Sequence, residues 1–144
     1  MKPSTKDVRR TSFGFLIKTL SARLDAQMEI ELKRHGLNLK QFGTLMMVFE
    51  MEGASQIEIG KNVGIPGYAT TRTLDELEKK GLVYRHRPPE NRRTHHIYLT
   101  DEGKKLRKVL PPIIQKVNDE ALAALNAEDQ NKLISILTKL TFGG

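Results

Sequence analysis

The sequence predicts a mainly α-helical fold with a small β-hairpin, arranged as a winged helix-turn-helix between longer flanking helices. Three observations support this prediction. A capped short helix, a glycine-containing turn and a second amphipathic helix follow one another from Ser55 to Lys80. A basic two-stranded hairpin follows between Leu82 and Leu99. Long segments with a single apolar stripe stand on both sides of this stretch.

Each element has its own local signal. Ser55 supplies an N-cap with Glu58 at the third helical position, which predicts a capping box, and Gly64 suits the sharp bend of the turn. Pro111-Pro112 is expected to kink the fifth helix rather than end it, because the apolar spacing persists on both sides. The predicted elements are a loose arm over 1–9, helices over about 10–34, 40–51, 56–63, 66–80, 101–125 and from 127 onward, and strands over 82–87 and 94–99.

Composition favours an anionic partner. The chain has 144 residues, with 24 Lys and Arg against 17 Asp and Glu, which gives a formal net charge of +7. An excess of this size favours nucleic acid over a membrane surface, although a basic protein without such a partner is the alternative. The absence of cysteine excludes disulfides, thiolate catalysis and thiol-based redox sensing. No apolar run approaches the length of a membrane span and no signal peptide is recognisable, so we expect a cytoplasmic protein.

The helix-turn-helix is expected to contact double-stranded DNA. In this motif the second helix lies in the major groove with its first residues at the base edges, while the first helix braces on the backbone. Arg72 can contact guanine or clamp a phosphate. Two alternatives stay open: Arg72 paired with Asp75 or Glu76, and Tyr68 in a packing role. The predicted contacts here are Ser55, Gln56, Gly67, Tyr68, Ala69, Thr71 and Arg72.

The hairpin adds a second basic element. Its predicted DNA contacts are Arg85, Arg87, Arg92 and Arg93, and the only acid between the first and last of these is Glu90. Arginine at a narrow hairpin tip suits the minor groove, where the negative potential is strongest. A charge cluster on a turn can also be merely solvated, but its place directly after a helix-turn-helix favours the contact with DNA.

These pieces, in this order, resemble the MarR family of bacterial transcriptional regulators over nearly the whole chain. The matching residues are Gln56-Ile57-Glu58-Ile59, Thr71-Arg72, Asp75, Leu77-Glu78, Gly81-Leu82-Val83, Arg93, Leu99-Thr100 and Gly103. The resemblance implies a homodimeric repressor, released by a small and typically anionic aromatic ligand bound between the dimer helices and the lobe. The family usually has an aspartate two residues before the wing arginine, which orients that arginine. Here Asn91 precedes Arg93, so a wing held less firmly is expected.

The flanking helices predict dimerisation independently of the resemblance. Their apolar stripes exceed what one winged lobe can cover, although a monomeric helical cap over the lobe is the alternative. We therefore expect one domain over 1–144, in which 10–36 and 100–142 form a helical dimerisation region and 37–99 form the DNA-binding lobe.

Other constellations are weaker. His86, His95 and His96 lie near the hairpin, but neighbouring strand residues face opposite sides, so no metal site is expected. The methionines suit either the core or an adaptable ligand pocket. No catalytic set is recognisable, so neither an enzyme nor a cofactor is expected. The predicted function is a sequence-specific regulator, in particular a repressor, on a pseudo-palindromic operator with half-sites about 10 bp apart. The alternatives are a winged-helix module that binds RNA or a protein, and an unrecognised enzyme.

Overall fold

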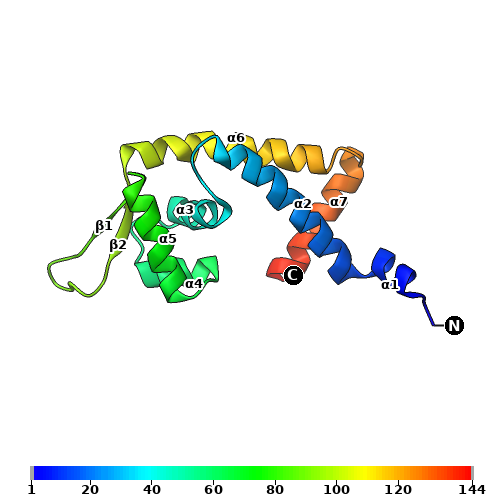
Figure 1. The fold of residues 1–144 in the computed structure, drawn as a ribbon, viewed down its shortest axis with the longest axis horizontal. Coiled ribbons are helices and arrows are strands. Elements are labelled where there is room, and N and C mark those ends of the chain that lie inside the picture. The colour runs from blue at the N-terminus through cyan, green and yellow to red at the C-terminus, as the bar shows by residue number, and fades with distance from the viewer. Residues whose placement is uncertain (1, 144) are drawn as a thin grey trace.

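The computed structural model describes residues 2–143, and the mainly helical fold with a two-stranded hairpin is confirmed. In chain order the elements are α1 (Thr5–Thr11), α2 (Phe13–Lys33), α3 (Leu39–Glu50), α4 (Gln56–Val63), α5 (Gly67–Lys79), β1 (Val83–His86), β2 (His96–Leu99), α6 (Asp101–Ala121) and α7 (Ala127–Phe142). The molecule is elongated (Figure 1). The lobe of α3, α4, α5 and the hairpin lies at one end, while α6 runs along the length toward α7, α2 and α1 at the other.

The hydrophobic core lies mainly within the lobe. Leu45 of α3 and Leu74 and Leu77 of α5 are fully buried, and Leu32 of α2 and Leu110 of α6 extend the same cluster. Burial of each such side chain contributes about 1.5–3 kcal/mol. Leu74 and Leu77 therefore anchor α5 to the lobe, and α3 is its central core helix.

The hairpin closes the lobe with one face inward. β1 and β2 are antiparallel, with Val83 opposite Leu99 and Tyr84 opposite Tyr98. Residues directly opposite each other in such a pair point to the same face. Val83 and Leu99 are buried, whereas the rings of Tyr84 and Tyr98 stack on the other face with centroids 5.5 Å apart. The backbone N–H of Gln56 donates to the carbonyl of His95 at 2.9 Å, which ties the start of α4 to the hairpin.

The N-terminal prediction was wrong in two respects. The expected loose arm contains a helix, α1, and the expected helix from Arg10 onward is broken at Ser12. Ser12 has an extended backbone, and its hydroxyl accepts from the Phe15 N–H, so it begins a new helix. Ser4 and Asp7 form a capping box that holds α1.

Two helices at the other end complete the fold. α6 continues through Pro111-Pro112, as expected, but ends at Ala121 rather than near Leu125. Gly103 in its first turn packs directly against the Leu82 carbonyl, where no side chain would fit. α7 begins after the predicted Asn126 cap and buries none of its residues. Within residues 2–143, no helix has the length and apolarity that crossing a membrane requires.

Candidate nucleic-acid interface

The bend between α4 and α5 depends on glycine at two positions. Gly64 ends α4 in the left-handed conformation, with φ of 80°, which favours glycine. A Cβ on Gly60 would lie 2.8 Å from the Thr70 hydroxyl oxygen, so the two helices approach closely only because this position has no side chain. Pro66 is the N-cap of α5 rather than its first helical residue, as had been expected.

The first turns of α5 present polar side chains to solvent. Tyr68 is 80% exposed, which argues against a packing role within this chain, and Arg72 is exposed as well. Gly67 and Thr71 are also exposed, whereas Ala69 is half-buried. Arg72 forms no ion pair in the described part of the chain, and its alternative partner Asp75 pairs with Arg85 instead. The Arg72 guanidinium is therefore free to bind an anion.

Arg85 occupies a different environment from the one expected of a DNA contact. Its Nη1 lies 2.7 Å from Asp75 Oδ1 and 3.4 Å from Glu78 Oε1, and its side chain is only 13% exposed. Its Nη2 donates to the Thr71 carbonyl at 3.2 Å, and its Nε donates to Gln56 Oε1 at 3.1 Å. The guanidinium thus joins α4, α5 and β1 within the lobe, and this geometry does not favour its predicted contact with DNA.

The start of α4 is engaged internally as well. Ser55 is 8% exposed, and its hydroxyl accepts from the Glu58 N–H at 3.2 Å and lies 3.1 Å from Glu58 Oε1. Glu58 thus bonds the Ser55 hydroxyl rather than the backbone N–H that a full capping box requires. Gln56 Nε2 donates to the Thr71 hydroxyl at 2.7 Å. Both side chains bond within the helix-turn-helix. Ser55 is buried, while Gln56 is half-buried and engaged with Thr71 rather than free for DNA.

The tip of the hairpin carries exposed arginines, and the side chain of Asn91 orders the loop beside them. Arg87, Arg92 and Arg93 are all exposed. Asn91 Oδ1 accepts from the Arg93 N–H at 3.2 Å, and Asn91 Nδ2 donates to the Thr94 hydroxyl at 2.7 Å. An Asx-type turn of this kind orders a loop without any charge pairing. Asn91 therefore orders the loop locally at the position where the MarR family usually has an aspartate.

The histidines of the hairpin do not form a cluster of metal ligands. Within residues 2–143 no group of three or more potential ligands is arranged to hold a metal ion. His96 Nδ1 lies 2.9 Å from the Gly53 carbonyl, while the buried Nδ1 of His95 has no partner. Burial, followed by repulsion from Arg87 and Arg85, lowers the pKa of His95 below its ordinary value. The neutral ring is therefore favoured at this position.

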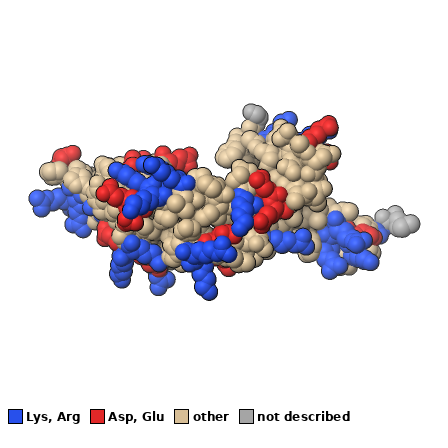
Figure 2. All heavy atoms as spheres, turned by 90° about the horizontal axis from the view of Figure 1, so that it is seen from above, with Lys and Arg blue, Asp and Glu red and all other residues tan. Residues whose placement is uncertain are grey.

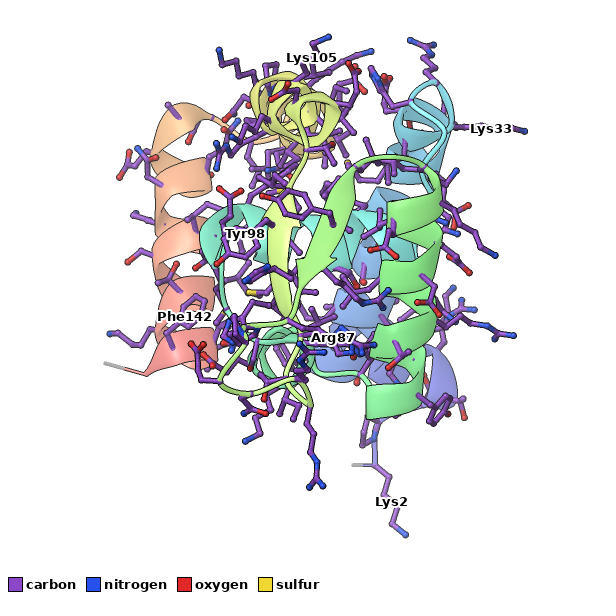
Figure 3. The ribbon with its side chains drawn as sticks, turned by 90° about the vertical axis from the view of Figure 1, so that its left-hand side faces the viewer. Lys2, Lys33, Arg87, Tyr98, Lys105 and Phe142 are labelled. Atoms are coloured by element: carbon purple, nitrogen blue, oxygen red, sulfur yellow. The ribbon has the colours of Figure 1, made fainter. Side chains whose placement is uncertain are left out.

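The exposed elements share one side of the molecule. In Figures 1 and 3, the first turn of α5 and the loop of the hairpin lie opposite α6, and Arg87 lies at the loop end of the hairpin. A capped bracing helix, a tight bend, an exposed second helix and a basic wing thus occur together in one lobe. Residues 37–95 match the MarR family. The predicted resemblance to MarR-family regulators is thereby confirmed for the winged lobe.

Solved MarR-family structures share the fold beyond this lobe. The reduced form of MarR from E. coli is 25% identical, with a TM-score of 0.83 over 90% of this chain and 96% of that chain. A MarR variant from E. coli complexed with operator DNA is 24% identical, with a TM-score of 0.82 over 96% and 99%. The transcriptional repressor CouR, bound to a DNA duplex, is 24% identical, with a TM-score of 0.85 over 96% and 99%.

The sequence contained a signal for the inward position of Arg85 in this MarR-like lobe. Alternate residues of a strand share a face, so Arg85 shares the face of the buried Val83. The acids that bind it are Asp75, which was expected only as an alternative partner of Arg72, and Glu78. Their spacing of three on α5 places both on one face, directed at the same strand. Strand alternation and helical spacing together would have predicted this cluster.

Proposed function

We propose that this chain is a sequence-specific DNA-binding transcriptional regulator whose α5 enters the major groove of duplex DNA. One observation carries the proposal: Arg72 is exposed and unpaired on the first turns of α5, while the nearby acid Asp75 is occupied by Arg85. An arginine that is free in this position can donate two parallel hydrogen bonds to a guanine edge. The loop of the hairpin lies on the same side of the molecule as the first turn of α5 (Figure 1), and its exposed arginines would add phosphate or minor-groove contacts.

The structural relatives support this assignment. One MarR structure from E. coli contains operator DNA and the CouR structure contains a DNA duplex, and each aligns with 96% of this chain. For this chain, the base-reading candidates on α5 are the exposed residues Gly67, Tyr68, Thr71 and Arg72, and the half-buried Ala69 is left out. Thr71 would act through its methyl group, because its hydroxyl accepts from Gln56 and donates to the Gly67 carbonyl. The wing candidates are Arg87, Arg92 and Arg93. Ser55, Gln56 and Arg85 serve instead to hold these elements in place.

We further propose that the regulator acts as a homodimer through 10–36 and 100–142, with 37–99 as the DNA-binding lobe. α7 is a 16-residue helix with an apolar face and no buried residue. Ile136, Leu140 and Phe142 are 58%, 65% and 83% exposed, as is much of the apolar face of α2. Apolar surface of this extent on terminal helices fits a second copy of the chain. Two lobes related by a two-fold axis would then meet successive major grooves, about 10 bp apart.

An effector site along α2 fits the repressor role. A shallow hollow of about 580 Å³ lies against this helix. It combines the aromatic ring of Phe15 with the cations Lys18 and Arg23, which suits an anionic aromatic compound. A ligand that favours one separation of the two lobes would shift the population that binds DNA. Benzoate, as a simple probe of this class, should weaken binding of operator DNA if this proposal is right.

Binding to duplex DNA, hairpin RNA and single-stranded DNA, each measured against salt concentration, tests the proposed function. We expect preference for a duplex selected from a random pool, and we expect Arg72→Ala to weaken that binding by about 1–3 kcal/mol and relax base preference. Lys104→Ala, which removes an exposed cation from α6, is the matched control and should leave affinity unchanged. Equal affinity for RNA and duplex DNA without sequence preference would refute the proposal and favour an RNA-binding module.

A further inference from the structure

We propose that the N-terminal arm, defined here as residues 2–12, is a second DNA-contacting element that binds phosphates on the side of α5 away from the wing. This inference rests on the proposed DNA-binding function. It adds an element that lies outside both the helix-turn-helix and the hairpin. It also assigns a role to a segment whose residues up to 9 were expected to form a loose arm and whose residues 10–12 were expected to begin the first dimerisation helix. In the structure α1 ends at Thr11 and α2 begins at Phe13, so the arm is separate from the long helix of the proposed dimerisation region.

The arm has a concentrated positive charge. Lys2, Lys6, Arg9 and Arg10 stand against the single acid Asp7, which leaves three net positive charges. All four cations are exposed, and none forms an ion pair within residues 2–143. The Asp7 carboxylate instead accepts from the Ser4 hydroxyl at 2.6 Å and from the Ser4 N–H at 3.2 Å.

The cations of α1 are also aligned. Lys6, Arg9 and Arg10 are spaced at i, i+3 and i+4, so they lie on one face of the helix. The capping box of Ser4 and Asp7 fixes the start of this helix and thereby the direction of that face. Because the helix is fixed before it meets a ligand, less conformational entropy is lost when the cations bind.

α1 lacks the surface that a protein partner would need. It packs against α2 but buries none of its own residues, and a seven-residue helix is too short to be stable alone in water. Its only large apolar side chain is Val8, which is 48% exposed. The core of a protein interface is depleted in charged residues. A polyanionic surface therefore fits this face of α1 better than an apolar one.

The arm lies on the DNA-facing side of the molecule. In Figure 1, α1 and the first turn of α5 both lie below α6, at different positions along the long axis. Figure 3 shows the same relationship from the end of the molecule: Lys2 lies at the bottom and Lys105 of α6 at the top. Figure 2, which views the molecule from above, shows Lys and Arg side chains at the end that carries α1 as well as along the rest of its length.

This placement determines which part of the DNA the arm would meet. The wing and α1 lie at opposite ends of the long axis, with α5 closer to the wing. A duplex that passes along this axis beneath α5 and the wing would also pass beneath α1. Lysine and arginine at that position bind backbone phosphates, which adds affinity but no base preference. The arm would therefore increase affinity for every sequence and leave the readout to α5.

The test compares two full-length variants that lose the same charge. We expect Arg9→Ala/Arg10→Ala to bind both a selected duplex and a mixed-sequence duplex about tenfold more weakly. The slope of log affinity against log salt should fall by about 0.9 for each lost phosphate contact. Lys104→Ala/Lys108→Ala, on the exposed face of α6, is the control and should keep the wild-type slope. Arg9→Lys/Arg10→Lys should restore most of the lost affinity.

Several results would overturn the inference. One is that Arg9→Ala/Arg10→Ala binds DNA as tightly as the wild-type protein. Another is that this variant and Lys104→Ala/Lys108→Ala weaken DNA binding equally. The third is that Arg9→Ala/Arg10→Ala changes the oligomeric state in sedimentation. The last result would make the arm a contact between subunits. If Arg72→Ala weakens binding while the arm variant does not, only this inference fails. If the wild-type protein has no preference for duplex DNA, the proposed function itself fails.

Discussion

Arg85 Nη1 lies 2.7 Å from Asp75 Oδ1, so an arginine of the wing strand is bound to an acid of the proposed recognition helix. The pair connects β1 to α5, and the additional bonds from Arg85 to Gln56 and Thr71 include the start of α4. This one side chain thus fixes the relative positions of the three elements that are proposed to meet DNA. It also leaves Arg72, on the same helix, without an acidic partner.

The first prediction concerns this connection. Arg85→Ala should lower the free energy of unfolding by about 1–3 kcal/mol, because Asp75, Glu78 and Gln56 all lose a charged partner. Asp75→Ala should cost about 0.2–1 kcal/mol, since Asp75 is 53% exposed. Urea unfolding of both variants and of the double variant forms a double-mutant cycle, which gives the interaction free energy between Arg85 and Asp75. Arg87→Ala, which removes an exposed arginine, is the control. If Arg85→Ala instead keeps full stability and loses only DNA affinity, the original prediction of a DNA contact is right.

The second prediction concerns Gly103, which packs against the backbone of the strand region. Gly103→Ala should destabilise the protein by about 1–3 kcal/mol, because the new methyl group meets the Leu82 carbonyl and a side-chain carbon of Leu99. Gly43→Ala is the matched control. Gly43 lies in the middle of α3 and has no atom within 4 Å of an added Cβ, so alanine there should stabilise by about 0.5–1 kcal/mol. If the midpoint temperature of thermal unfolding shifts in the same direction for both variants, this packing is contradicted.

The third prediction concerns the wing. Asn91→Ala removes the side-chain bonds to the Arg93 N–H and the Thr94 hydroxyl, so the hairpin tip should lose order. We expect DNA affinity to fall several-fold while the free energy of unfolding changes by less than about 0.5 kcal/mol, because the site is exposed. Asn91→Asp retains an acceptor for the Arg93 N–H and should bind more tightly than the alanine variant. Equal affinity of all three proteins would show that Asn91 does not order the wing for DNA.

The fourth prediction concerns pH. Burial and two nearby arginines lower the pKa of His95 from its ordinary value of 6.5, so the unfolded chain takes up a proton before the folded one does. The contribution of His95 to the free energy of unfolding should be fully present above pH 6.5. It should decline as the pH falls below 6.5 toward the pKa of His95 in the folded state. Urea unfolding at a series of pH values checks this. His95→Gln should remove this part of the decline, and an unchanged profile in that variant would assign the decline to other groups.

The fold followed closely from local patterns. The Ser55 cap and the Gly64 bend each act within a few residues, so the sequence predicted them directly. Ser12 was missed because a serine within an apolar period can either cap a new helix or continue the old one. The strands were predicted longer than they are, because hairpin residues near a turn have the same composition as strand residues.

What the sequence by itself determined about this protein is the order of its elements, the inward faces of its helices and the resemblance of its winged lobe to the MarR family. The tertiary structure decided at what distances the polar side chains meet. The strand position of Arg85 and the helical spacing of Asp75 and Glu78 indicate only which sides face each other. Ser55 bonds Glu58 at the start of its own helix, whereas Gln56 and Arg85 are engaged by partners from other elements. Their distances depend on how α4, α5 and β1 pack. The same packing leaves Arg72 unpaired and places the cations of α1 on the side of α5 and the wing, and no local pattern encodes either relationship.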